Sequence, residues 1–247
     1  MRIRVGHLYP DRLNIYADRG NIAVLTTRAA ARGHELEVAA IGLGDAVPEA
    51  DLFYVGGGQD REQALVASDL ESKADLLRES VELGAAFLAV CGGYQLLGRD
   101  YRGRDGSWLE GAGLFPHETV AGETRMIGDV LLESTLDEAL GRTIAGFENH
   151  AGRTVLDPGA EPLGRVVAGY GNDGASGFEG CRVGRAVGTY LHGPLLPRNP
   201  WLADLLLSWA IAHASGGEPE PLAPLHDELE AAAHAVAAGR ARGRGGR

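Results

Sequence analysis

The stretch Phe87-Leu88-Ala89-Val90-Cys91-Gly92-Gly93-Tyr94-Gln95-Leu96-Leu97 decides the fold of this chain. Small and apolar residues lead up to Cys91, two glycines follow it, and the residues from Tyr94 onward can open a helix. A buried strand that turns sharply into a helix is typical of a nucleophile elbow, which holds a reactive side chain at the tip of a sheet. Glycine suits this turn because it relaxes the backbone and lets a substrate approach it closely. The alternative interpretation is that Cys91 is a small buried hydrophobic residue without chemistry.

The composition is typical of a globular protein. Its 247 residues suffice for one large α/β domain or two small ones, and such a core needs no disulfide. No apolar run approaches the roughly 20 residues of a membrane span, and the chain enters a strand at Met1-Arg2-Ile3-Arg4 without a signal peptide, which favours a cytoplasmic protein. The two cysteines, Cys91 and Cys181, form no disulfide framework, and no Cys/His spacing predicts a metal site. No role is predicted for Cys181.

The charge pattern argues against nucleic acid as a partner. The formal net charge is −11, whereas binding to nucleic acid or to an anionic membrane requires Lys and Arg that neutralise phosphates. The exception is the arginine-rich end from Gly239 to Arg247, which we interpret as a solvated, flexible tail.

Strands and helices alternate along the first half of the chain. The predicted strands are Ile3–Leu8, His34–Ile41, Asp51–Val55 and Phe87–Val90, and the predicted helices are Asn21–Ala31, Asp60–Ala67 and Leu70–Leu83. This alternation predicts an α/β fold, with a mostly parallel central sheet flanked by helices. The working site of such a sheet lies beyond the carboxyl ends of its strands, where both the Gly56-Gly57-Gly58 triplet and Cys91 fall.

The second half adds further β structure. Its predicted strands are Met126–Leu132, Thr143–Phe147, Arg165–Tyr170, Cys181–Val183 and Ala186–Leu191, followed by helices at Asn199–His213 and Leu225–Ala238. No linker separates the two halves. We therefore predict one domain over residues 1–215, and a C-terminal helix with a basic, flexible tail over residues 216–247.

A cysteine nucleophile needs a base and an acid, and histidine can serve as both near neutral pH. Of the eight histidines, His192 alone directly follows a strong strand, which would place it on the same rim of the sheet as Cys91. His150 is its main competitor, and His117 falls in a predicted polar loop. The alternative for His192 is a structural loop histidine.

Backbone amides near Cys91 are candidates for stabilising an oxyanion. The N–H groups of Gly57 or Gly58, together with that of Gly92, are predicted to point at the oxygen of a tetrahedral intermediate. The alternative is that these glycines only form tight turns.

Several segments together resemble the cobyric-acid-synthase-like class I glutamine amidotransferases. They are Val55-Gly56-Gly57-Gly58-Gln59-Asp60-Arg61-Glu62-Gln63, Cys91-Gly92-Gly93-Tyr94-Gln95, Gly146-Phe147-Glu148-Asn149-His150 and Gly188-Thr189-Tyr190-Leu191-His192-Gly193-Pro194. More narrowly, the chain resembles the glutaminase subunits of bacterial lipid II isoglutaminyl synthases, whose pattern also includes Asp11–Asn21 and Arg125–Asp129. The resemblance runs from about Leu8 to Pro194 and implies the flavodoxin-like architecture of class I amidotransferases.

The resemblance also implies a reaction. Cys91 would attack the γ-carboxamide carbon of glutamine, His192 would protonate the departing ammonia, and water would hydrolyse the resulting thioester. Arg125 would bind the α-carboxylate of glutamine, for which a guanidinium is well suited. The alternative for Arg125 is an exposed arginine that precedes a strand.

Pro194 departs from the broader class I pattern, which places a glutamate two residues after the histidine. The resemblance implies that a Mur-ligase-like partner, MurT, supplies an aspartate in trans. Glu148 is the candidate for an in-chain substitute, although a structural role is the favoured interpretation of Glu148. In the resulting heterodimer the partner would use ATP and the ammonia to amidate lipid II during peptidoglycan synthesis. This chain lacks Gly-x-x-x-x-Gly-Lys-[Ser/Thr], so no cofactor is expected in it, and ATP and Mg²⁺ are expected in the partner.

Two other functions remain open at this point. One is an amidotransferase subunit of corrinoid biosynthesis. The other is a catalytically silent binding or regulatory module on the same fold. The C-terminal helix and its arginines are a candidate docking element for the partner or for the surface that carries the lipid substrate.

Overall fold

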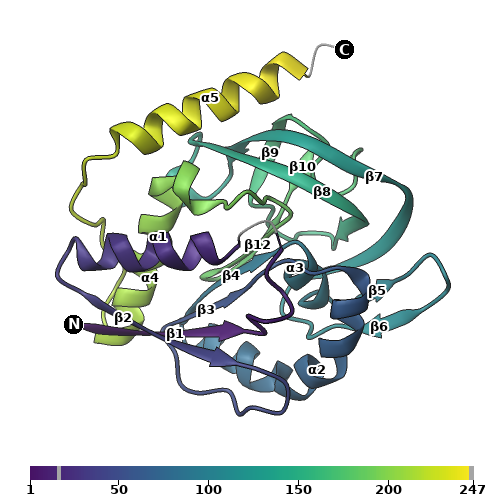
Figure 1. The fold of residues 1–247 in the computed structure, drawn as a ribbon, viewed down its shortest axis with the longest axis horizontal. Helices are drawn as coiled ribbons and strands as arrows, with labels where there is room; N and C mark the ends of the chain where they lie inside the picture. Colours follow the sequence, from purple (N-terminus) through teal and green to yellow (C-terminus); the bar gives the residue numbers. More distant parts are fainter. Residues whose placement is uncertain (16–17, 245–247) are drawn as a thin grey trace.

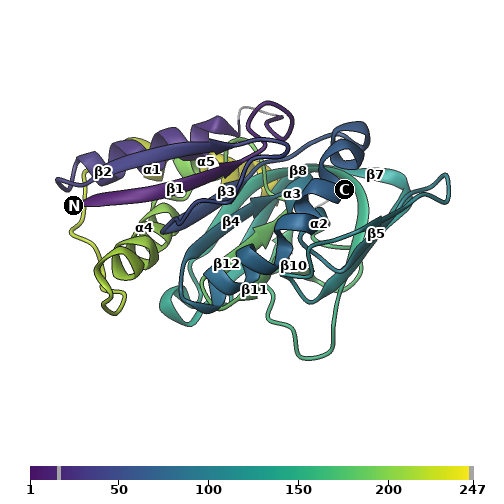
Figure 2. The same cartoon turned by 90° about the horizontal axis from the view of Figure 1, so that it is seen from below.

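A central sheet of six strands organises the molecule. In the computed structural model, which describes residues 1–15 and 18–244, its strands are β1 (Arg2–Leu8), β2 (Glu35–Ile41), β3 (Leu52–Val55), β4 (Ala86–Val90), β11 (Cys181–Val183) and β12 (Ala186–Thr189). Their order is β11-β12-β4-β3-β1-β2 (Figure 2). Only β11 is antiparallel to its neighbour, β12, so the predicted mostly parallel α/β sheet is confirmed. The strands agree with the predicted segments to within two residues.

Helices cover this sheet because its middle strands are apolar on both faces. All residues of β3 and β4 are buried, and the rings of Phe53 and Phe87 stack 5.7 Å apart. The helices are α1 (Arg19–Ala30), α2 (Asp60–Glu82), α3 (Gly92–Leu96), α4 (Pro200–Ser215) and α5 (Glu228–Arg244). From β1 to β2 the chain moves towards one edge of the sheet, and from β3 to β4 towards the other. Right-handed crossovers therefore place α1 and α2 on opposite faces, as Figures 1 and 2 show.

A second sheet contains the other six strands of the described residues. They are β5 (Asp100–Arg102), β6 (Trp108–Glu110), β7 (His117–Ser134), β8 (Thr143–Leu156), β9 (Gly164–Ala168) and β10 (Phe178–Glu179). The order is β10-β9-β7-β5-β6, and β8 pairs with β7. The sequence predicted only the apolar parts of β7 and β8. Polar residues dominate β7 before Met126, and the β7–β8 register shifts between Ala121 and Met126, so no simple alternation marks this half.

The helix α2 corrects a second prediction. The sequence suggested two helices interrupted near Asp69, whereas α2 is continuous from Asp60 to Glu82. The carboxylate of Asp69 accepts hydrogen bonds from the Tyr9 hydroxyl (2.7 Å) and the Gly44 amide (2.8 Å), and it pairs with Lys73 one turn later. Asp69 is thus occupied by tertiary contacts and does not end the helix.

The C-terminal helix is longer than predicted. It was expected to end at Ala238 before a flexible tail, but α5 continues to Arg244; residues 245–247 lie outside the described part of the chain. The buried alanines Ala237, Ala238 and Ala241 share an apolar cluster with residues of β7, β8 and β9, and Figure 1 shows α5 lying across these strands. Among the described residues, no helix is both long and apolar enough to span a membrane.

Candidate active site

Cys91 lies at the predicted sharp turn between β4 and α3. Its φ of 50° and ψ of −107° fall where residues other than glycine are rare, and such strain is frequent at functional sites. The following glycines are required by close packing. A Cβ on Gly92 would lie 2.8 Å from the Gly58 nitrogen, and one on Gly93 would lie 2.7 Å from a methyl group of Val55. The strand–turn–helix expected of a nucleophile elbow is therefore present.

His192 reaches Cys91 because β12 lies beside β4. The two strands run parallel with Thr189 opposite Val90, so both chains leave the sheet at the same rim. His192 is buried, and its backbone forms a bridge to Phe147 of β8. A Cβ on Gly57 would lie 2.7 Å from His192 Cε1 and 3.2 Å from Cys91 Cβ, so this glycine backbone contacts both residues. The structure brings the predicted pair together.

The surroundings of His192 favour its charged form. Burial disfavours the imidazolium, but the negative charge of Cys91 and hydrogen bonds with Asp18 and Cys91 outweigh this effect and raise the pKa of His192 to about 10. The imidazolium of His192 is therefore favoured while Cys91 carries its negative charge. It can hold a thiolate at Cys91 and has a proton ready for a leaving group.

Asp18 is a residue of this site that the sequence did not predict. Its Oδ1 lies 3.4 Å from His192 Nδ1, and both side chains are fully buried. Its Oδ2 accepts a 2.7 Å hydrogen bond from the Gly57 N–H. The only sequence signal was its place in the motif Asp11–Asn21, of which residues 16 and 17 lie outside the described part of the chain.

The contact with Asp18 corrects the prediction for Gly57. Because its N–H already donates to a carboxylate, it is not available to stabilise an oxyanion. Gly58 and Gly92 lie against each other beside Cys91, and Gly58 lines the adjacent cavity. Their role as oxyanion donors stays a prediction.

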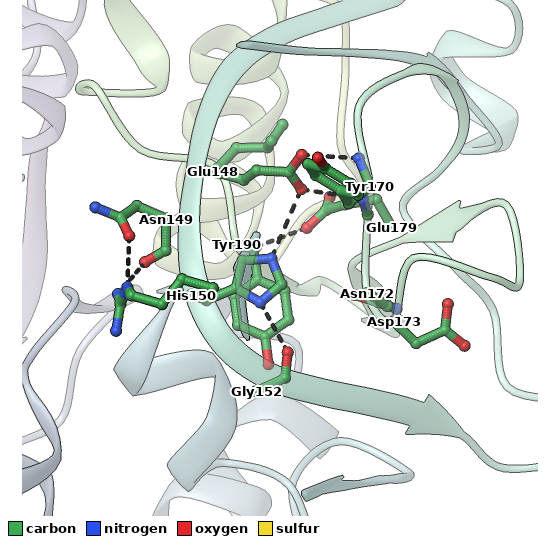
Figure 3. Close-up of polar contacts among 12 residues, drawn as sticks. Glu148, Asn149, His150, Gly152, Tyr170, Asn172, Asp173, Glu179 and Tyr190 are labelled. Atoms are coloured by element: carbon green, nitrogen blue, oxygen red, sulfur yellow. Dashed lines mark hydrogen bonds and ion pairs between the residues drawn. The ribbon is translucent and has the colours of Figure 1, made fainter. Parts of the chain in front are cut away.

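Pro194, at the position of the usual glutamate, packs against the start of α1. A Cβ on Gly20, near the start of α1, would lie 2.5 Å from Pro194 Cγ, so the proline packs directly on this helix. The same helix start provides Asp18 to His192. Glu148, considered as an in-chain substitute, is instead buried elsewhere: it accepts hydrogen bonds from the amides of Tyr170 (2.7 Å) and Gly171 (3.0 Å) (Figure 3). The substitute role of Glu148 is wrong.

A cavity of about 520 Å³ opens beside Cys91. Arg125 of β7 lines it, together with Asn149 of β8. The Arg125 Nε donates to Asn149 Oδ1 and its Nη2 to the Asn149 backbone oxygen, both at 2.8 Å. The structure thus places Arg125, predicted to bind the substrate carboxylate, in the wall of the cavity that contains the candidate nucleophile. The wall also includes Ile15, Gly58, Gln59, Arg61, Gln63, Gln95, Tyr101, His150, Ala151 and Gly152.

The other two candidate histidines have different surroundings. His150 lines the same cavity, but its Nδ1 bonds to the Gly152 oxygen (2.8 Å) and its ring stacks on Tyr190 with centroids 3.5 Å apart (Figure 3). His117, predicted in a polar loop, instead begins β7 and is fully buried. Burial lowers the pKa of His117 to about 3, so it stays neutral at physiological pH.

Glu179 is a buried carboxyl behind the site. It accepts hydrogen bonds from the Tyr190 amide (2.6 Å) and the Thr189 hydroxyl (2.9 Å). Burial outweighs these bonds and raises the pKa of Glu179 from 4.5 to about 8.

We expect Glu179→Gln to change how stability depends on pH. Between pH 4.5 and about 8 the unfolded chain has released a proton that folded Glu179 retains, so wild-type stability falls as pH rises, by at most about 1.4 kcal/mol per pH unit. Glutamine has no such proton. The free energy of unfolding of the variant, relative to that of the wild type, should therefore increase from acidic to alkaline pH. Urea unfolding across this range measures the difference, and a constant difference would contradict the expectation.

A buried cysteine at an elbow and a histidine that follows the neighbouring parallel strand define a nucleophilic site of the Cys–His class. The profile of the CobB/CobQ-like glutamine amidotransferase domain matches residues 4–200, and the chain belongs to this family.

Curated relatives and a solved structure agree with this assignment. The chain is 42% identical to the lipid II isoglutaminyl synthase (glutamine-hydrolyzing) subunit GatD of Staphylococcus aureus, over 84% of each chain. It is 38% identical to the subunit of the same name from Streptococcus pneumoniae, over 87% of this chain and 83% of the relative. The structure of PurLQS from Thermotoga maritima shares the fold, with a TM-score of 0.60 at 16% identity over 87% of this chain and 99% of that chain.

Proposed function

We propose that this chain is the glutaminase subunit of a lipid II isoglutaminyl synthase. It would hydrolyse L-glutamine to glutamate and ammonia. A partner subunit would use ATP and the ammonia to amidate the D-glutamate of lipid II to D-isoglutamine, a step of peptidoglycan synthesis. The observation that carries the proposal is the Cys91–His192 pair beside a cavity that Arg125 lines. Similarity over most of the chain to subunits named for this synthase favours it over corrinoid biosynthesis.

The reaction begins with a bond between Cys91 and the substrate. The Cys91 sulfur attacks the γ-carboxamide carbon, and the carbonyl oxygen becomes an oxyanion, for which the amides of Gly58 and Gly92 are the expected donors. His192 gives its proton to the nitrogen, the C–N bond breaks, and ammonia leaves a glutamyl thioester. His192, now neutral, takes a proton from water, which attacks the thioester and releases glutamate and the Cys91 sulfur.

We expect Arg125→Leu to weaken glutamine binding. The guanidinium is held by Asn149 in the cavity wall, and loss of charged hydrogen bonds to a carboxylate should raise KM by about 10- to 100-fold with little change in kcat. Steady-state ammonia release measures both constants. The control is Arg104→Leu, because Arg104 lies in an exposed turn and bonds to the Glu123 oxygen. An unchanged KM in Arg125→Leu would remove this residue from the substrate site.

The partner is expected to be a Mur-ligase-like synthetase of the MurT type, which would bind ATP and Mg²⁺ in a cytoplasmic heterodimer with this chain. The proposal is tested by co-purifying the two proteins, measuring ammonia release from glutamine, and determining by mass spectrometry whether lipid II becomes amidated. Ammonia release without amidation would support a glutaminase with another acceptor. No ammonia release even with the partner would favour a catalytically silent module.

Two carboxylates are candidates for orienting His192, one from the partner and one from this chain. An aspartate from the partner was expected because Pro194 replaces the usual glutamate. Such an aspartate would compete with Asp18 for His192 Nδ1, so variants of Asp18 separate the two arrangements.

A further inference from the structure

We infer that Asp18 is the positioning residue of this site. Its carboxylate orients His192, the general acid–base, and also holds the glycine loop beside the nucleophile Cys91. The inference rests on the proposed glutaminase function. Oδ1 faces His192 Nδ1 at 3.4 Å, and Oδ2 accepts the Gly57 N–H at 2.7 Å. Because Gly57 contacts both His192 and Cys91, this carboxylate joins the three parts of the site.

The side chain of Asp18 does not cap the helix that Asp18 precedes. Asp18 is the N-cap residue of α1, a position where aspartate commonly accepts hydrogen bonds from the first amides of the helix. In the described part of the chain its side chain makes no such capping bond. Both oxygens face the site instead, and the N-terminal end of α1 favours the negative charge that they carry.

The backbone of Asp18 is also fixed from two sides. The Tyr54 hydroxyl of β3 donates to the Asp18 carbonyl oxygen (3.0 Å) and accepts from Asn21 Nδ2 (3.1 Å). Asn21 Oδ1 in turn accepts from the Leu196 amide (2.9 Å), in the segment that follows His192. These bonds tie the start of α1 to the strand before the glycine loop and to the chain after the histidine.

This geometry defines what Asp18 does to His192. A carboxylate facing Nδ1 selects the tautomer that carries its proton there, which directs Nε2 away from Asp18, and it stabilises the imidazolium after proton uptake. A separation of 3.4 Å is long for a hydrogen bond, as is common before substrate binds. No residue of a partner is needed for this role.

The test is Asp18→Asn, studied in the isolated chain and together with the synthetase partner. Asparagine keeps the size of the side chain and an oxygen for the Gly57 N–H, but it has no charge to stabilise the His192 imidazolium. We expect kcat for L-glutamine to fall by about 10²- to 10⁴-fold, with KM changed by less than about threefold. Asp18→Glu, which keeps the carboxylate, should recover part of the rate.

The pH profile separates positioning from a general structural role. Wild-type kcat/KM should decline as pH rises through the pKa of His192 in the free protein, about 10, because above it the site has lost the proton that the leaving ammonia needs. Without the Asp18 carboxylate the imidazolium is less stable, so in Asp18→Asn this decline should begin at lower pH. Alkylation of Cys91 by iodoacetamide at about pH 6 to 8 gives a readout without glutamine, and it should be slower in Asp18→Asn.

The matched control is Asp11→Asn, in the same loop, whose side chain is 93% exposed and pairs with Arg19. Its kinetics and alkylation should match those of the wild type. The inference is overturned if Asp18→Asn retains the wild-type kcat, if its loss lies entirely in KM, or if the partner restores its full rate by supplying an acid in trans. A wild-type complex that releases no ammonia would instead refute the proposed function, and the alkylation comparison would still test Asp18.

Discussion

Cys91→Ala should abolish ammonia release from L-glutamine, lowering kcat by roughly 10⁴-fold or more, because no other group in the cavity can form the thioester. Alanine fits the strained turn as well as cysteine does, since both are small residues with one Cβ, so the fold should persist. Ammonia release by the purified chain, alone and with the partner, measures the effect.

The second cysteine provides the control for this prediction. Cys181 is fully buried, and burial raises its pKa to about 12, so it stays a neutral thiol. Cys181→Ala should keep the wild-type kcat, with at most a modest loss of stability. Activity that survives Cys91→Ala would refute the nucleophile assignment.

His192→Gln should reduce kcat by about 10³-fold or more, because the leaving ammonia loses its proton donor and Cys91 loses the cation that holds a thiolate. The same variant should also slow alkylation of Cys91 at neutral pH. Steady-state kinetics and iodoacetamide labelling measure the two effects independently.

Two other histidine variants show whether the effect is specific. His226→Gln changes an exposed residue that precedes α5, and its activity should equal that of the wild type. His150→Gln alters the cavity wall, so it should affect glutamine binding more than the chemical step. The assignment would be contradicted if His150→Gln removed activity and His192→Gln did not.

The central sheet could be predicted from the sequence because its signals are local. Short apolar strands end in glycine-rich turns. Because parallel strands end at one rim of the sheet, Cys91 and His192 could be predicted to lie close together although they are far apart in the sequence. The polar half of β7 could not be predicted, since backbone pairing with β8 holds it and no apolar alternation marks it. The continuity of α2 likewise depends on tertiary contacts of Asp69.

The site residues that follow strand ends could be predicted from the sequence. The residue that depends on packing between distant segments could not. Asp18 faces His192 where α1 packs on the segment that contains Pro194, and no spacing in the sequence reveals this contact. The same carboxylate takes the Gly57 N–H, so the oxyanion prediction failed for this glycine. An aspartate from the partner was expected at His192, and the Asp18 carboxylate of this chain lies at the same histidine nitrogen.

The most direct test of the proposed glutaminase site is covalent labelling with 6-diazo-5-oxo-L-norleucine, a reactive analogue of glutamine, followed by peptide mass mapping. We expect one label per chain, on the peptide that contains Cys91, with loss of ammonia release in proportion to labelling and protection by L-glutamine. Label on Cys181, or full activity in a chain labelled at Cys91, would contradict it.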